Sequence, residues 1–313
     1  MVERSAPAES TAPAATRCGF IAILGAPNVG KSTLLNRLVG TKVSIVTAKV
    51  QTTRRRILGI TVRGAAQLVF VDTPGIFQPR PGRRLELAMV RAAWHGAEDA
   101  DIRVLVVDAK RGLDADTRLV LDGLRERRER AILAINKLDL VRPPILLPLI
   151  QKFDETGLFD RVFIVSALNG DGCDDLLAVL AEGLPQGPWL FPEDQLSDLS
   201  QRAMAAELTR EQLFRQLHQE LPYSLTVETE GWVESEDGSE VRIDQTIYVQ
   251  RESQKAIVLG KGGQQIKAVG EAARRELAAM LGRRVHLFLF VKVRRKWLED
   301  PERYQELGLD FPA

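Results

Sequence analysis

From Cys18 to about Leu184, short apolar runs alternate with longer segments in which apolar residues recur at helical spacing. Strands are predicted at 19–24, 56–62, 67–71, 103–108, 131–135 and 162–165. Helices are predicted at 31–39, 83–97, 115–128, 144–156 and 173–183. Since alternating strands and helices build layered sheets, we expect an α/β domain with a mixed, mostly parallel sheet and helices on both faces.

The pattern changes after Leu184. Prolines within 185–199 predict a semi-rigid linker, whose Trp189 and Phe191 are expected to pack on a neighbouring domain. Beyond it, helical spacing over 201–220 precedes strand-like residues at 224–230 and 241–249, two helices around a glycine-rich turn, and a strand at 286–291. We therefore expect a tail at 1–16, a first domain at 17–184, the linker at 185–199 and an α+β domain at 200–313.

Residues 25–32, between the first strand and the first helix, read GAPNVGKS and fit the phosphate-binding pattern G-x-x-x-x-G-K-[ST]. Glycines let backbone N–H groups turn toward phosphate oxygens, and the helix adds its positive N-terminal end. Lys31 can reach the β- and γ-phosphates, and the Ser32 hydroxyl can ligate Mg²⁺. A chance glycine-rich turn is the alternative. The expected phosphate contacts are Gly25, Ala26, Pro27, Asn28, Val29, Gly30, Lys31, Ser32 and Thr33.

A second loop, Asn136-Lys137-Leu138-Asp139, follows the strand at 131–135 and has the N-K-x-D pattern of guanine-binding loops. The Asp139 carboxylate can accept hydrogen bonds from guanine N1–H and the N2 amino group, which adenine cannot match on that edge. Asn136 is expected to join this loop to the phosphate loop, and the Lys137 stem to cover one face of the base. Ser166 and Ala167 are a weaker candidate for a further base contact. An ordinary polar turn is the alternative for N-K-x-D taken alone.

Asp72-Thr73-Pro74-Gly75 ends the strand at 67–71 and resembles a D-x-x-G switch. Asp72 would hold Mg²⁺ through a water, and the Gly75 N–H would sense the γ-phosphate. Thr53 is preferred over Thr52 as a further Mg²⁺ ligand, so the expected metal set is Ser32, Thr53 and Asp72. Loss of the γ-phosphate would release both segments, which predicts an order–disorder switch.

The residue after D-x-x-G is Ile76, where Ras-like GTPases have a glutamine that positions water. Hydrolysis is therefore expected to be slow unless another group assists it. Asn28 offers a hypothesis, because an asparagine in this phosphate loop resembles those that help to hold K⁺ against the phosphates. The alternative is that Asn28 only caps the loop. The residues expected to act in hydrolysis are Asn28, Lys31, Thr53 and Gly75.

The composition indicates the general class of protein and adds little else. The chain has 313 residues, a net charge of +1 and 45% hydrophobic residues, which suits a globular protein of two domains. Cys18 and Cys173 form no metal or disulfide pattern, and no apolar run is long enough to span a bilayer. The Ala- and Pro-rich start lacks a secretory apolar stretch, so we expect a cytoplasmic protein.

The second domain carries the turn Gly260-Lys261-Gly262-Gly263 between two helices. A G-x-x-G turn lets a nucleic-acid backbone approach closely, and an apolar groove beside it can accept single-stranded bases. The alternative is a plain turn, but basic residues nearby favour RNA. The expected RNA contacts are Lys255, Ile257, Val258, Gly260, Lys261, Gly262, Gly263, Ile266, Lys267 and Arg274.

The phosphate loop, Gln-Thr-Thr-Arg at 51–54, D-T-P-G, N-K-L-D and an αββααβ domain with G-x-x-G together resemble the Era family of bacterial GTPases. The resemblance implies a P-loop GTPase domain followed by a type II KH domain, with GTP/GDP and Mg²⁺ as cofactors. It further implies binding to 16S rRNA near its 3′ end, a role in 30S subunit biogenesis and a peripheral association with the inner membrane. A monomer is the default expectation.

Three functions compete at this point. The first is an enzyme that uses GTP hydrolysis as a timer on RNA binding. The second is an RNA-binding module whose GTP site only senses nucleotide, and Ile76 keeps this reading open. The third is a metabolic P-loop kinase, which would have no use for N-K-x-D or a KH domain.

Overall fold

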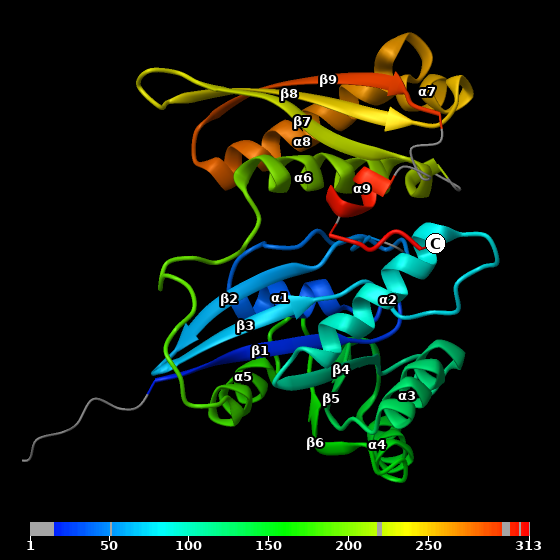
Figure 1. The fold of residues 1–313 in the computed structure, drawn as a ribbon, viewed down its shortest axis with the longest axis vertical. Coiled ribbons are helices and arrows are strands. Elements are labelled where there is room, and N and C mark those ends of the chain that lie inside the picture. Colours follow the sequence, from blue (N-terminus) through cyan, green and yellow to red (C-terminus); the bar gives the residue numbers. More distant parts are fainter. Residues whose placement is uncertain (1–15, 51, 218–220, 296–300, 307, 313) are drawn as a thin grey trace, which may run out of the picture.

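The computed structural model describes residues 16–50, 52–217, 221–295, 301–306 and 308–312. Apart from Thr16, the expected N-terminal tail lies outside these residues. The described chain forms one sheet in the order β2-β3-β1-β4-β5-β6 and a second in the order β7-β8-β9 (Figure 1). No helix in these ranges is long and apolar enough to cross a bilayer.

The larger sheet has the mixed, mostly parallel arrangement expected. β2 runs antiparallel to β3, and the other neighbouring strands are parallel. The strands are β1 (Arg17–Leu24), β2 (Ile57–Arg63), β3 (Ala66–Asp72), β4 (Ile102–Asp108), β5 (Ala131–Asn136) and β6 (Phe159–Ile164). The helices are α1 (Lys31–Val39), α2 (Arg84–Glu98), α3 (Ala115–Arg127), α4 (Leu146–Asp154) and α5 (Cys173–Gly183), with short 3₁₀ turns η1 (Leu138–Leu140) and η2 (Pro143–Ile145).

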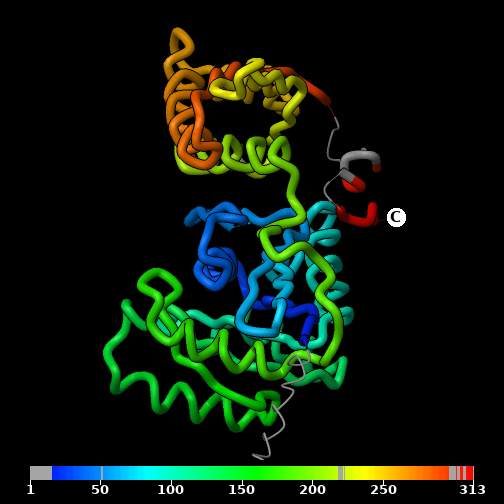
Figure 2. The backbone as a smooth tube through the Cα atoms, turned by 90° about the vertical axis from the view of Figure 1, so that its left-hand side faces the viewer, coloured from blue at the N-terminus to red at the C-terminus, as the bar shows by residue number. Residues whose placement is uncertain are grey.

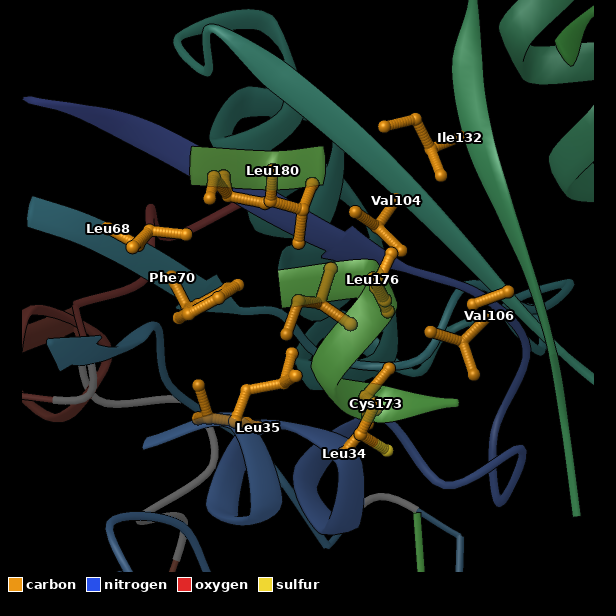
Figure 3. Close-up of a cluster of buried hydrophobic side chains, with 14 of the residues drawn as sticks. Leu34, Leu35, Leu68, Phe70, Val104, Val106, Ile132, Cys173, Leu176 and Leu180 are labelled. Atoms are coloured by element: carbon orange, nitrogen blue, oxygen red, sulfur yellow. The ribbon is translucent and has the colours of Figure 1, made fainter. Parts of the chain in front are cut away.

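Two cores hold the helices on the two faces of this sheet. On one face, Leu34 and Leu35 of α1 and Leu176 of α5 pack against strand residues such as Phe70 and Val106 (Figure 3). On the other face, α2, α3 and α4 cover the alternate residues of the same strands. Each central strand is thus buried on both sides, which explains its continuous apolar run. The predicted α/β fold is confirmed.

The sixth strand differs from its prediction of 162–165. The strand begins at Phe159. The prediction missed its first residues because β6 lies at the edge of the sheet, where the Asp160 and Arg161 side chains are exposed. An edge strand with solvated polar residues lacks the apolar run that identifies a buried strand.

The linker packs along the outer strands of the larger sheet. Trp189 and Phe191 pack against the buried cluster around Leu58 and Val69, as expected, and Trp189 Nε1 donates to the Ala65 carbonyl at 3.1 Å. The Ile60 N–H of β2 donates to the Leu196 carbonyl at 2.9 Å. The linker therefore covers part of the edge of β2.

The second sheet supports the αββααβ order. β7 (Thr226–Glu234) and β8 (Glu240–Val249) are antiparallel, and β9 (Arg284–Val293) runs parallel to β8. The remaining elements are α6 (Gln201–Gln216), η3 (Leu221–Ser224), α7 (Glu252–Leu259), η4 (Lys261–Gly263), α8 (Gln264–Leu281) and α9 (Pro301–Glu306). The type of domain expected from the sequence, an α+β KH fold, is confirmed.

Two boundaries in this domain differ from the predictions. The helix predicted at 201–220 ends at Gln216, because Leu217 has an extended backbone that carries its side chain into the core; residues 218–220 lie outside the described chain. The strand predicted at 224–230 begins at Thr226 and continues to Glu234, past a register shift after Thr229.

The C-terminal segment returns to the first domain. Tyr304 and Leu309 are buried against Leu85 and Met89 of α2, and Arg84 lies over the Phe311 ring at 5.3 Å. Figure 2 shows this segment separate from the second sheet and beside α2. Tyr304, Leu309 and Phe311 thus pack with α2, although they fall within the range predicted for the second domain.

Candidate functional site

The loop between β1 and α1 has backbone geometry that only its glycines permit. Gly25 and Gly30 have φ values of +146° and +100°. A Cβ on Gly25 would lie 2.4 Å from the Val106 carbonyl oxygen, and one on Gly30 would lie 2.3 Å from Asn136 Nδ2. The loop therefore curls tightly enough to direct its amides inward, which is the requirement for a phosphate site.

Lys31, the first residue of α1, places its cation at this loop. Its side chain is buried, and its Nζ donates to the Gly25 and Ala26 carbonyls at 3.0 and 2.9 Å. Burial lowers the pKa of Lys31 to about 8, against the opposing influence of Asp72. The ammonium is thus oriented by the loop itself and remains protonated at neutral pH.

Side-chain oxygens from three separate segments meet beside Lys31. Ser32 Oγ donates to Asp72 Oδ2 at 2.7 Å, and Thr53 Oγ1 lies 3.0 Å from Ser32 Oγ. The other Asp72 oxygen, Oδ1, is buried without a hydrogen-bond partner in the described structure. Burial raises the pKa of Asp72, whereas hydrogen bonds and the Lys31 charge lower it. An orphaned carboxylate oxygen beside two hydroxyls fits a hard divalent cation such as Mg²⁺.

This oxygen set is incomplete as a protein cage. Within the described ranges, no group of three or more His, Cys, Asp or Glu side chains could hold a metal. Mg²⁺ usually takes one or two carboxylates and completes its shell with water and substrate phosphates. The arrangement therefore suits a nucleotide-bound Mg²⁺.

The structure separates the two neighbouring threonines. Thr52 Oγ1 lies 2.6 Å from Thr47 Oγ1 and donates to the Lys49 carbonyl at 2.7 Å, so a local turn occupies it. Thr53 is buried and faces Ser32 and Asp72. Of the two threonines, Thr53 has the hydroxyl that could join Ser32 and Asp72 in binding a metal ion.

Sequence reasoning missed Ser44. Its buried hydroxyl donates to Asp72 Oδ2 at 2.8 Å, and its backbone N–H donates to Asn36 Oδ1 at 2.9 Å. Ser44 lies in a segment without regular structure, so no periodicity marks it. It helps to hold the Asp72 carboxylate in place by donating to the same oxygen as Ser32.

The N-K-x-D loop is joined to the phosphate loop as expected. Asn136 Nδ2 donates to the Val29 carbonyl at 2.9 Å, and its Oδ1 accepts from the Ala167 N–H at 2.9 Å. Lys137 Nζ donates to the Asn28 carbonyl at 2.7 Å, and the Ser166 hydroxyl donates to Asp139 Oδ1 at 2.6 Å. A single asparagine thus connects three loops, and Ser166 orients the carboxylate that would bind a base.

A second missed residue supports Lys137. Asp108, at the end of β4, is buried and accepts from Lys137 Nζ at 2.7 Å. Its position directly after an apolar strand was the available signal, because parallel strands present their C-terminal ends at one edge of the sheet.

The D-T-P-G segment lies against the phosphate loop. The Ile76 N–H donates to the Gly25 carbonyl at 3.1 Å, and a Cβ on Gly75 would approach Pro27 to 3.0 Å. Thr73 donates its hydroxyl to the Ile23 carbonyl at 2.8 Å and is buried. The Ile76 side chain is buried in the core beneath α2, so it cannot orient water.

A cavity of about 360 Å³ lies between these segments, lined by the phosphate loop, residues 45–48, Thr52, Thr53, Gly75 and Lys137. A larger hollow of about 450 Å³ lies beside the opposite ends of the strands, among Arg130, Asp160 and their neighbours. The smaller cavity is lined by residues of the phosphate loop together with Thr53, Gly75 and Lys137, so it is the candidate nucleotide site.

The G-x-x-G turn is open to solvent. Gly260, Gly262 and Gly263 all have positive φ, and a Cβ on Gly262 or Gly263 would meet nothing within 4 Å. The basic side chains Lys261, Lys267 and Arg274 are exposed, and Lys255 and Ile266 are half-buried. Ile257 is 56% exposed on α7. An apolar side chain thus stands beside an approachable backbone and several cations.

One predicted RNA contact is wrong. Val258 is fully buried in the core with Val269 and Ile247, so its side chain cannot meet a base. Neighbouring residues on a helix face different directions, and α7 turns Ile257 outward where it turns Val258 inward.

These features define a class: a P-loop protein with a guanine-type base loop, joined to a KH domain. Residues 20–137 match the family model described as a 50S ribosome-binding GTPase, and residues 220–298 match the KH domain model.

Similar proteins identify the family. The GTPase Era proteins of Brucella suis biovar 1 (strain 1330) and Rhizobium meliloti (strain 1021) are each 58% identical, the first over 95% of both chains and the second over 95% of this chain and 94% of its own. A crystal structure of Era with MgGDPNP and nucleotides 1506–1542 of 16S ribosomal RNA matches with a TM-score of 0.88 and 38% identity, over 94% of this chain and 99% of its own. A variant of Aquifex aeolicus Era bound to GDP·AlF₄⁻ matches equally well. The chain belongs to the Era family and is a GTPase.

Proposed function

We propose that this protein binds GTP and GDP with Mg²⁺, hydrolyses GTP, and binds single-stranded 16S rRNA near its 3′ end during 30S subunit biogenesis. The observation that supports it most strongly is that one chain combines the clustered Ser32, Thr53 and Asp72 oxygens with an open, basic G-x-x-G turn. The Era structure with MgGDPNP and a 16S rRNA segment, which aligns over 94% of this chain, supports both halves of the proposal.

The nucleotide roles follow from the contacts described above. Lys31 would hold the β- and γ-phosphates, while Ser32, Thr53 and Asp72 would hold the cation that neutralises them. Asp139 would select guanine, with Asn136 and Ser166 keeping its loop in place. The remaining proposed nucleotide contacts are Gly25, Ala26, Pro27, Asn28, Val29, Gly30, Thr33, Thr73, Pro74, Gly75, Lys137 and Ala167.

For RNA, the proposal retains the solvent-accessible residues around the turn. The exposed cations would contact phosphates, and Ile257 and Ile266 would lie against bases. The proposed set is Lys255, Ile257, Gly260, Lys261, Gly262, Gly263, Ile266, Lys267 and Arg274.

The RNA site has a sharp test. Gly262→Asp is expected to weaken RNA binding about tenfold or more, because a carboxylate would face the nucleic-acid backbone. Hydrolysis of GTP without RNA should be unchanged. Gly238→Asp is the matched control, because Gly238 also has positive φ with open space around it but lies in the β7–β8 turn. Equal RNA affinity of the Gly262→Asp and wild-type proteins in a titration would contradict the proposed groove.

Hydrolysis needs a charge-stabilising group in place of glutamine, and we propose K⁺ held with the help of Asn28. Asn28 Nδ2 donates to the Ala48 carbonyl at 2.9 Å, so Oδ1 is the atom that would bind the ion. Phosphate release is expected to be about tenfold faster in KCl than in NaCl, and Asn28→Ala should remove the difference. Equal rates in the two salts would refute the role of K⁺.

The timer function also makes a prediction about coupling. A labelled oligonucleotide from the 16S rRNA 3′ end should bind more tightly to the protein loaded with a non-hydrolysable GTP analogue than with GDP. Equal affinities would mean that the nucleotide switch acts on another partner, such as the 30S subunit. Multiple-turnover phosphate release with RNA present separates this enzyme from a protein that only senses GTP.

The remaining proposals concern location, oligomeric state and domain limits. We propose a cytoplasmic monomer, and a peripheral association with the inner membrane is proposed from the family resemblance alone. The proposed domain limits are 17–184 and 200–313, with 185–199 as the linker.

A further inference from the structure

Helix α6 of the KH domain carries a buried polar face. Glu207, Arg210, Glu211 and Gln212 are all less than 9% exposed. In Figure 1, α6 lies on the side of the KH domain nearest the GTPase domain. Charged residues are rarely buried unless they are paired. The groups that pair with these side chains therefore explain how α6 can carry them.

Those partners come largely from residues 42–54 of the GTPase domain. Lys42 pairs with Glu211 and with Glu276 of α8, and the Val46 N–H donates to Glu211 Oε1 at 3.2 Å. Lys49 donates to the Phe214 and Leu217 carbonyls. Three residues of the segment that leads to the proposed metal ligand Thr53 thus contact the RNA-binding domain.

The contact on the N-terminal side of Thr53 is made by Arg210. Its guanidinium donates to the Thr52 carbonyl at 2.6 Å while it pairs with Glu207 on the same helix. Glu207 orients Arg210, because a carboxylate and a guanidinium hold each other in a defined geometry. The carbonyl of Thr52 belongs to the peptide that enters Thr53.

The contact on the C-terminal side is made by Arg54. This side chain is 1% exposed, donates to the Leu225 carbonyl at 2.7 Å, and lies 5.4 Å from the Phe214 ring centre. Arg210 lies 5.2 Å from the same ring centre. The Phe214 ring therefore lies beside one guanidinium group from each domain. The hydrogen bond from Arg54 to the Leu225 carbonyl is a further contact between the domains.

We propose that Glu207, Arg210 and Arg54 form a latch through which the KH domain positions Thr53 for the Mg²⁺ of a bound triphosphate. Both neighbours of Thr53 are tied to the KH domain, whereas its own hydroxyl faces Ser32 and Asp72. The latch residues are positioning residues, since they act through Thr53. The inference rests on the proposed role of Thr53 as a metal ligand.

The latch has a state-specific consequence. In this type of switch the threonine is held by Mg²⁺ only while the γ-phosphate is present. Opening the latch should therefore weaken GTP binding and leave GDP binding unchanged. By thermodynamic reciprocity, a partner that moves α6 changes GTP affinity by the same factor as GTP changes the affinity for that partner.

The test uses the full chain with Glu207→Leu and Arg210→Met together, because apolar replacements of a buried ion pair are often tolerated by the fold. Dissociation of a fluorescent GTP analogue and of fluorescent GDP would be followed across Mg²⁺ concentrations. If the fraction of molecules with Thr53 in place falls to about a tenth, the analogue should dissociate about tenfold faster at limiting Mg²⁺. Excess Mg²⁺ should restore much of the loss, and GDP should dissociate at the wild-type rate.

Arg54→Met, which opens the other side of the latch, provides a second variant in case the double variant is unstable. Arg242→Met with Asp244→Leu is the control, since it removes an ion pair within β8 whose described contacts involve Phe288 and not the latch residues. Thr53→Ala tests the metal-ligand role of Thr53 separately from the latch. If Thr53→Ala leaves the Mg²⁺ dependence of the analogue unchanged, the proposed role of Thr53 fails. The latch is overturned if Thr53→Ala changes this Mg²⁺ dependence while both latch variants behave as wild type. It is also overturned if the latch variants speed the dissociation of GDP as much as that of the GTP analogue.

Discussion

Lys31→Ala is expected to abolish tight GTP binding. The Lys31 ammonium is buried in the phosphate loop and oriented by two backbone carbonyls, so its removal takes away the cation held at this position. Truncating one partner of a buried charge pair costs about 2–5 kcal/mol, which corresponds to a loss of roughly 30- to 5,000-fold in affinity. Equilibrium titration with a fluorescent GTP analogue measures this loss directly.

Lys152→Ala is the matched control for Lys31→Ala. Lys152 is exposed on α4, away from the phosphate loop, and its removal should leave affinity unchanged. Thermal unfolding of both variants checks that the fold is retained. Nanomolar GTP binding by Lys31→Ala would contradict the assignment of the site.

Asp139→Asn should shift the base preference from guanine toward xanthine. The carboxylate is matched to two donors on guanine, and Ser166 holds one of its oxygens in place. An amide offers one donor and one acceptor, which fits the additional carbonyl of xanthine. Leaving a polar group unmatched costs about 1–3 kcal/mol, so we expect GTP affinity to fall roughly 5- to 150-fold while XTP affinity rises.

Competition between GTP and XTP for a fluorescent nucleotide measures this preference. Asp154→Asn, an exposed carboxylate on α4, should retain the wild-type preference for GTP. A preference for GTP over XTP that survives in Asp139→Asn would refute the pairing. Because Lys31 acts on phosphates and Asp139 on the base, the Lys31→Ala variant should lose GTP and XTP alike.

The motifs could be predicted because their chemistry is local. Residues 25–32 and 136–139 each bring phosphate- or base-binding groups together within one short loop at the end of a strand. The alternation of strands and helices likewise predicted the α/β layer arrangement, since each buried strand needs cover on both faces. The αββααβ order followed from the same periodicities.

Predictions were less accurate where the packing of neighbouring elements determines the burial of a side chain or the ends of an element. The apolar run before the glycine-rich turn is compatible with a groove, but the rotation of α7 buries Val258 and exposes Ile257. β6 begins earlier than its apolar run because an edge strand is partly solvated. Leu217 continues a helical pattern, yet its backbone is extended and its side chain enters the core.

By itself, the sequence determined the class of protein, the phosphate and base loops and the two-domain organisation, because contiguous residues and short periodicities specify them. Only the tertiary structure decided that Thr53 rather than Thr52 faces Ser32 and Asp72. It alone showed that Ser44 supports Asp72 and that buried charges on α6 meet residues 42–54. Those contacts join segments far apart in the chain, so no local pattern encodes them. The contacts of Thr53 and Ser44 need the folded GTPase domain, and those of α6 also need the two domains to be packed together.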